Sequence, residues 1–409
     1  MKKIILAAFG LALATGAYAQ IDVVKAAERA MKDGSDAAQV VELITPAMTN
    51  PETATLAQTW YVPGKASYGE YDRLLGFKQL NRLPENGDQK MAGLLVDGFN
   101  YFMKAFPLDS VTDNKGKIKT KYSKDMANII AGHANDYLNM GISMYNDHSD
   151  YEAAYNLWSV YTQLPSVRAL ANKLPAQTDT AYGEIAFNQA LAAWQLNRYD
   201  DALNAFLHAK SLNYKKKNLY DYAIAVAQLA GKNDTLLALA EEALPMYGSE
   251  DNMYMGQIIN HYLQARDFDN AFRIINQAIA DNPNNAQYYV IQGVLYENND
   301  NKEAATAAYE HAMQLDSQNV QALFNYGRML CDKAFTAADA APTTDAEYVP
   351  YAEANIYPYF RQAAEILEQA YSINPEGNEV MDILNYLENI YYNLNDAEKL
   401  QNTKDRKLL

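Results

Sequence analysis

Apolar and small residues recur along the second half of the chain with helical spacing. Tyr289, Gly293 and Tyr296 lie at i, i+4 and i+7, which places them on one face of a helix. Polar turn-forming residues follow at 297–301, and a second apolar stripe begins at Ala305. This pattern predicts a pair of helices joined by a short turn.

The same pattern returns at an interval of 34 residues. The matched positions are Met255 and Tyr289, Tyr262 and Tyr296, Ala271 and Ala305, Ala278 and Ala312, Pro283 and Ser317, and Gly293 and Gly327. A fixed period of this length is typical of stacked helical hairpins, in which each unit completes the core of its neighbour. Such arrays bind other molecules more often than they catalyse reactions, so binding is the expected role.

Glycine inside the first helix of a unit also needs an explanation. It costs about 1 kcal/mol relative to alanine in a helix interior. Gly293 is tolerable if another helix passes close by, and the small residues Ala305 and Ala312 on the second helix fit the same close approach. Tyr289 and Tyr309 are then expected to fill the space beside them.

The order of residue types within a unit resembles that of the tetratricopeptide repeat (TPR). This order is a large residue, a glycine and an aromatic residue in the first helix, then alanine, aromatic and alanine in the second. Units beginning near 183, 217, 252 and 286 carry this order with substitutions, such as Ile259 in the glycine position. The resemblance covers about a third of the chain well and about two thirds loosely. It implies an all-α fold, an α-α superhelix or solenoid of about nine helical hairpins. Two hairpins are expected to carry long insertions, near 69–90 and 336–359.

The amino terminus has the pattern of an export signal. Lys2 and Lys3 precede an apolar run at 4–14, and Ala17-Tyr18-Ala19 has the small-x-small form of a cleavage site. We therefore expect a signal peptide at 1–19 and a periplasmic or secreted protein. Because the sole cysteine, Cys331, lies far from this site, we expect no lipoprotein anchor.

The rest of the chain is predicted to be soluble and to fall into two parts. No later run of about 18 apolar residues occurs, so no transmembrane segment is expected. We predict an irregular TPR-like helical region at 20–166, a seam at 167–182 around Pro175, and a C-terminal TPR array at 183–409.

Charge limits the choice of partner. The chain has 34 Lys and Arg against 50 Asp and Glu, a net charge of -16. An acidic surface repels phosphate backbones, so nucleic acid is excluded as a partner. The lysines at 115, 117, 119, 121 and 124 form a local basic strip, which is more often a solvated loop than a binding patch.

Catalytic and metal-binding patterns are absent from the sequence. The five histidines are scattered singly, without the spacing of a metal-binding helix. No phosphate-binding glycine loop or nucleophile elbow occurs, and Cys331 has no local signature of a nucleophile. We predict no enzyme, no cofactor and no metal site, with a helical-array enzyme as a weak alternative.

The TPR resemblance implies that the first helix of each hairpin lines a concave groove. The corresponding positions are Phe187, Asn188, Trp194, Tyr222, Gln257, Asn260, Gln264, Val290, Phe324, Asn325, Arg328, Tyr386, Asn389 and Tyr392. Aromatic rings with amide side chains suit an extended peptide. A glycan stacked on the rings is the alternative partner.

Two further features bear on this groove and on modification. A TPR clamp for a terminal carboxylate needs a lysine five places into a first helix, where this chain has Phe187, Val290 and Phe324, although Asn188 and Asn325 match its asparagine.

Ser110, Thr180 and Thr235 each follow an aspartate in a short motif that resembles an acceptor for O-linked sugars.

Overall fold

The structure is a computed structural model that describes residues 20–112, 118–174, 176–248 and 252–408. The predicted signal peptide at 1–19, and Lys115 and Lys117 of the basic strip, lie outside the described residues. The chain divides into two compact units, Met1–Leu239 and Ala240–Leu409. This division lies within one helix and not in the region 167–182.

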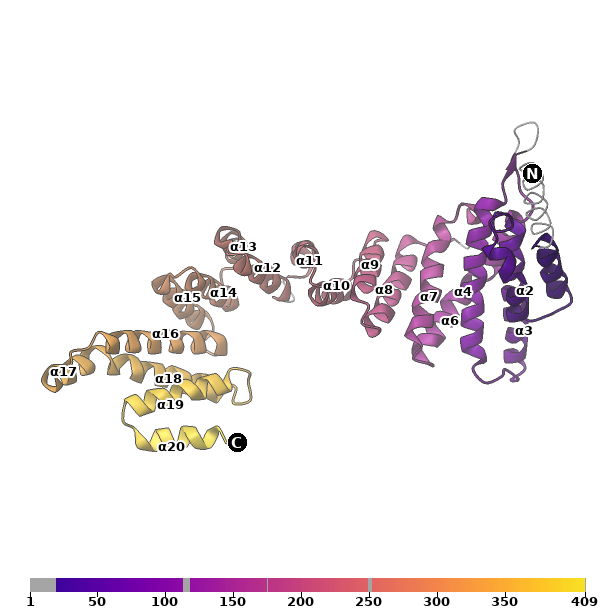
Figure 1. Cartoon of the computed structure of the whole chain (residues 1–409). Coiled ribbons are helices and arrows are strands. Elements are labelled where there is room, and N and C mark those ends of the chain that lie inside the picture. The colour runs from indigo at the N-terminus through magenta and orange to yellow at the C-terminus, as the bar shows by residue number, and fades with distance from the viewer. Residues whose placement is uncertain (1–19, 113–117, 175, 249–251, 409) are drawn as a thin grey trace, which may run out of the picture. The chain divides into compact units, whose positions relative to one another are not determined.

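Unit 1 consists of antiparallel helices in sequence order (Figure 1). Its helices are 20–32, α2 (Ala37–Thr49), α3 (Ala57–Gln79), α4 (Gly87–Ala105), α5 (Ser123–Gly132), α6 (Ala134–Asn146), α7 (Tyr151–Gln163), α8 (Asp179–Gln195), α9 (Tyr199–Ser211) and α10 (Lys217–Leu229). Single 3-10 turns lie at η1 (Phe106–Leu108), η2 (Leu164–Ser166) and η3 (Arg168–Leu170). Two short antiparallel strands, β1 (Val111–Thr112) and β2 (Ile118–Lys119), precede α5.

Unit 2 continues the same order. The division falls within α11 (Asn233–Tyr247), and the helices that follow are α12 (Met253–Gln264), α13 (Phe268–Asp281), α14 (Ala286–Asn298), α15 (Lys302–Leu315), α16 (Val320–Asp339), α17 (Asp345–Asn355), α18 (Tyr357–Ile373), α19 (Val380–Asn393) and α20 (Ala397–Arg406). Counting α5 and α6 as one broken helix and α17 as an insertion, the described residues form nine consecutive helix pairs. The predicted all-α fold of about nine helical hairpins is confirmed.

Short polar side chains set where the helices begin. Asn301 and Asn319 each accept a hydrogen bond from the backbone N–H three residues later, at 3.1 and 2.9 Å. Such capping stabilises a helix start by about 1 kcal/mol. Asp300 adopts a left-handed conformation with φ of 56°, which ends the polar turn between α14 and α15. The turn predicted at 297–301 is therefore built by this asparagine and aspartate chemistry.

The repeat glycines lie where two helices approach closely. A Cβ at Gly293 would be 2.5 Å from the ring of Tyr309, and one at Gly327 would be 2.7 Å from Leu367. Tyr309 has no exposed surface, and its hydroxyl donates a hydrogen bond to Glu297 at 2.9 Å. The close approach expected from the sequence is confirmed, and it fixes how the two helices of a hairpin pack.

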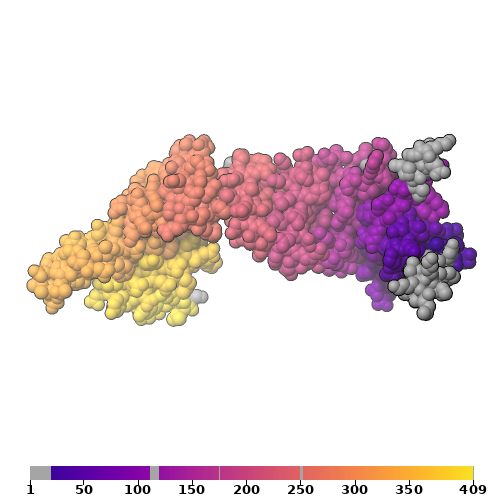
Figure 2. All heavy atoms as spheres, turned by 45° about the horizontal axis from the view of Figure 1, so that its top comes forward, coloured from indigo at the N-terminus to yellow at the C-terminus, as the bar shows by residue number. Residues whose placement is uncertain are grey.

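The two predicted insertions differ from one another. Near 69–90 the structure has no additional element, because α3 and α4 are simply long, with 23 and 19 residues. Near 336–359 α16 is extended to Asp339, and α17 follows as a separate helix before α18. In both views of the whole chain α17 lies at the far end of α16 (Figures 1 and 2).

The predicted seam at 167–182 is part of the core of unit 1. Leu164 and Leu170, at the two 3-10 turns, are almost fully buried. Tyr161 donates a hydrogen bond across the segment to Gln177 at 2.8 Å, and Tyr182 belongs to the same hydrophobic cluster. Leu170 and Tyr182 therefore connect this segment to the apolar core of unit 1.

Asp109 is buried for a structural reason. Its carboxylate accepts hydrogen bonds from the backbone N–H groups of Lys121, Tyr122 and Ser123 at 2.6–3.1 Å, and from the Ser123 hydroxyl at 2.7 Å. Asp109 therefore fixes the start of α5.

In the part of the chain that the structure describes, no helix is long and apolar enough to cross a membrane.

Candidate functional site

The first helices of three consecutive hairpins in unit 2 line a groove of ≈ 380 Å³. Its apolar floor consists of Ile259 and Leu263 from α12, Val290, Ile291 and Val294 from α14, and Phe324 from α16. Val290 is 3 % exposed, so it contributes packing more than surface. The floor results from helical spacing, since each helix presents residues three or four apart toward the same side.

Amide side chains flank this floor. Asn260, Gln287, Gln321 and Asn325 line the groove, and Glu379 contributes a carboxylate from the residue before α19. The Gln287 side chain donates a hydrogen bond to Gln321 at 2.8 Å. These two residues are one repeat apart, so the same position of adjacent repeats forms a short amide ladder along the groove.

Arg328, another predicted groove residue, does not line the groove and is held by a carboxylate of the preceding first helix. One guanidinium nitrogen contacts both carboxylate oxygens of Glu297, at 2.6 and 2.7 Å. Burial alone would lower the pKa of Arg328, but the hydrogen bonds to Glu297 raise it above its ordinary value. Arg328 therefore links α14 to α16 and keeps only part of its hydrogen-bonding capacity for a ligand.

One of the hairpins that form the groove matches a known sequence family. Residues 286–319, which span α14, α15 and the turn before α16, match the family model for the tetratricopeptide repeat. The chain therefore contains a tetratricopeptide repeat. The α14–α15 hairpin is thus a TPR unit, and the next first helix repeats its glycine as Gly327, whereas the preceding one has Ile259 at that position.

Solved structures of TPR proteins resemble the chain at low sequence identity. A TPR protein from Bacteroides fragilis is 19% identical, with 61% of this chain and 95% of that chain covered and a TM-score of 0.32. The C-terminal part of a TPR protein from Cytophaga hutchinsonii is 15% identical, with 69% of this chain and 93% of that chain covered and a TM-score of 0.38. A tetratricopeptide repeat protein from Parabacteroides merdae is 12% identical, with 62% of this chain and 98% of that chain covered and a TM-score of 0.34. No curated protein matches at the sequence level.

The structure brings four of the predicted groove residues together. Asn260, Val290, Phe324 and Asn325 all line the groove of unit 2. Tyr386 lies next to it, with its ring edge-on to Phe324 at 6.1 Å between ring centres. Gln257, Gln264, Asn389 and Tyr392 do not line it.

The predicted positions in unit 1 form a different arrangement. Phe187 is 5 % exposed and packs against Phe206, Tyr214 and Tyr222. Trp194 lies edge-on to Tyr222, with ring centres 5.5 Å apart. Asn188 lines a hollow of ≈ 150 Å³ with Trp158 and Tyr145. Phe187 therefore serves the core of unit 1, whereas Tyr222 is 39 % exposed.

Sequence reasoning missed several groove residues. Ile259, Leu263, Ile291 and Val294 could have been found from their helical spacing, and Gln287 and Gln321 from the repeat interval. Glu379 could not, because it reaches the groove only through the hairpin of α16 and α18, which contains α17.

Two observations bear on reactive chemistry. Among the described residues, no group of three or more His, Cys, Asp or Glu side chains could hold a metal ion. Cys331 is fully buried, and this burial, together with the nearby Asp332 carboxylate, raises its thiol pKa to about 12. The thiol is therefore protonated at neutral pH, as expected for a packing residue.

Proposed function

We propose that this protein is an exported TPR scaffold that binds an extended segment of another protein in the groove of unit 2. The observation that supports this most directly is the composition of the groove. An aliphatic floor can accept alternate side chains of an extended chain, and amides along its edge can pair with the main chain.

The floor also favours a peptide over a glycan. Sugars bind by stacking on flat aromatic faces, and Phe324 is the one aromatic residue that lines the described groove. The Phe324 ring is itself in contact with Tyr386. The side-chain amides of Asn260 and Asn325 make no hydrogen bond within the described chain, so both are available to a main-chain partner.

Site-specific cross-linking in cells tests this function. A photoreactive amino acid at Asn325 should capture one defined protein, identified by mass spectrometry. The same group at Gln314, an exposed position on α15, is the matched control and should capture nothing above background. Phe324→Ala should abolish capture at Asn325.

Synthetic peptides that tile the captured protein should then identify a single binding segment by calorimetry. Capture that is equal at Asn325 and Gln314, or a captured protein with no binding segment, would remove the groove as the binding site.

Export is a separate part of the proposal. The basic, apolar and small-residue pattern of the first 19 residues supports it. Amino-terminal sequencing of the protein from an envelope fraction should begin at Gln20. An intact Met1 in that fraction would rule out cleavage.

A further inference from the structure

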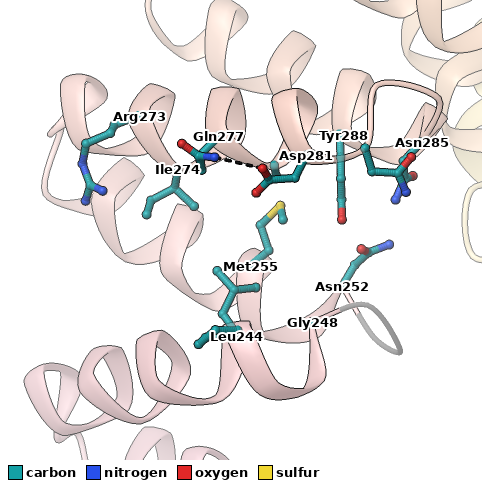
Figure 3. A pocket seen from close by; sticks show the side chains of 13 residues that line it. Leu244, Gly248, Asn252, Met255, Arg273, Ile274, Gln277, Asp281, Asn285 and Tyr288 are labelled. Atoms are coloured by element: carbon teal, nitrogen blue, oxygen red, sulfur yellow. Dashed lines mark hydrogen bonds between the residues drawn. The ribbon is translucent and has the colours of Figure 1, made fainter.

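A second pocket in unit 2 shares no residue with the groove. It has a volume of ≈ 520 Å³ and is bounded by the end of α11, the start of α12, and α13 (Figure 3). Leu244, Met255 and Ile274 form its apolar part. This volume lies in the range typical of sites for small ligands.

Tyr288 gives this pocket an unused hydrogen-bonding group. Its side chain is only 8 % exposed, yet its hydroxyl has no hydrogen-bond partner in the part of the chain that the structure describes. Figure 3 shows the hydroxyl pointing into the pocket, toward the side where Asn252 and Met255 lie. The rest of the side chain is buried, so the hydroxyl is the part of Tyr288 that a molecule in the pocket can contact.

Two opposite charges project from α13 at separate places in the pocket. Arg273 and Asp281 are eight residues apart, which corresponds to about 12 Å along a helix. Neither belongs to an ion pair within the described residues. Arg273 Nε donates to Asn270 at 3.3 Å, and Asp281 accepts from Gln277 at 3.0 Å. The terminal guanidinium nitrogens and the second carboxylate oxygen therefore remain available.

We propose that this pocket binds a short free peptide of three or four residues. Its terminal ammonium would pair with Asp281, and its terminal carboxylate with Arg273. An extended chain of three or four residues spans about 10–14 Å, which matches the separation of the two charges. The polar side chains that lie between or beside these charges, including Gln277, Asn252 and Asn285, can bind the peptide backbone.

Other ligands would use less of what the pocket offers. The Asn285 oxygen caps α14 by accepting from the backbone N–H of Gln287 at 3.0 Å, which leaves its amide N–H groups to donate to a carbonyl of the ligand. A phosphate or a simple cation would leave one of the two charges without a partner. An uncharged sugar would need neither. Because the pocket shares no residue with the groove, this proposal does not depend on the proposed function.

Calorimetry on the full chain with synthetic alanine-leucine peptides of two to six residues tests the length. Three and four residues should bind most tightly. Acetylating the amino end or amidating the carboxyl end should each weaken binding about tenfold or more, because each removes a charged hydrogen bond. Equal affinity for free and blocked peptides, or the absence of binding at any length, would overturn the proposal.

Variants then assign each end of the peptide. Asp281→Asn should lower the affinity for the free peptide but leave the affinity for the acetylated peptide unchanged. Arg273→Gln should lower the affinity for the free peptide but leave the affinity for the amidated peptide unchanged. Tyr288→Phe removes only the hydroxyl and should weaken all forms. Asp269→Asn, an exposed aspartate of α13 that does not line the pocket, is the control and should bind as the original.

Two results would contradict this assignment. One is a loss of affinity in Asp281→Asn and Arg273→Gln that is equally large for the free, acetylated and amidated peptides. The other is tight binding of an oligosaccharide that Asp281→Asn and Arg273→Gln do not alter. Phe324→Ala, which alters the groove, should leave peptide binding at this pocket intact, so failure at one site can be told from failure at the other.

Discussion

At the scale of single residues, some helical glycines of this chain are required by a close contact with a neighbouring side chain, and others are not. At Gly293 a side chain would collide with the buried ring of Tyr309, whereas at Gly256 on α12 no atom lies within 4 Å of an added Cβ. Both positions are helical, so the backbone gain from alanine is about the same, between 0.5 and 1 kcal/mol. Only the contact with a neighbouring helix differs.

The corresponding prediction compares two variants. Gly293→Ala should lower the free energy of unfolding by about 1–3 kcal/mol, because Tyr309 cannot move without leaving its place in the core. Gly256→Ala should leave it unchanged or raise it by up to about 1 kcal/mol. Urea unfolding followed by circular dichroism measures both, and a Gly293→Ala variant as stable as the original would show that the close approach is not required.

At the scale of elements, one buried carboxylate determines where α5 begins. Burial alone would raise the pKa of Asp109, but the hydrogen bonds from the Ser123 hydroxyl and from three backbone N–H groups lower it below its ordinary value. A carboxylate with a lowered pKa stabilises the fold above its unfolded pKa, near 4. That stabilisation is lost as the pH falls through the folded value.

Asp109→Asn should therefore destabilise unit 1 by about 2–3 kcal/mol at neutral pH, since charged hydrogen bonds are replaced by weaker ones. The difference from the original protein should shrink below about pH 4, where Asp109 itself becomes protonated. Thermal unfolding at a series of pH values measures this. Asp33→Asn, an exposed aspartate of the same unit, should show no such dependence. A difference for Asp109→Asn that stays constant with pH would contradict the account.

The elements also show what could and could not be predicted from the sequence. The hairpin of α14 and α15 could be predicted because Gly293, Tyr309 and the polar turn between them are close in sequence and repeat at a fixed interval. The role of Asp109 could not, because its partners lie 12–14 residues later, beyond a strand pair. Phe187 was assigned to the groove by register alone, although three aromatic rings surround it.

At the scale of the whole molecule, buried tyrosines link stability to alkaline pH. Burial, together with the carboxylate of Glu310, raises the pKa of Tyr326 to about 12, and burial raises the pKa values of Tyr68, Tyr309 and Tyr391 further. A tyrosine with a raised pKa stabilises the fold below its unfolded pKa, about 10. That contribution is lost as the pH rises from there toward the folded value.

The chain, with 32 tyrosines, should thus lose helix content cooperatively at high pH. The ultraviolet absorbance of phenolate should show exposed tyrosines ionising first, and the buried ones ionising together with the loss of the helical circular dichroism signal. Ionisation of every tyrosine near its ordinary pKa while the helices stay intact would contradict the burial described here.

The groove of unit 2 is the central claim about what this molecule does, and hydrogen–deuterium exchange of the full chain with its captured partner tests it most directly. The account predicts slower exchange on binding in α12, α14 and the first half of α16, with no change in α13 and α15. Protection confined to α13 and α15, or absent from all five helices while the partner is bound, would contradict it.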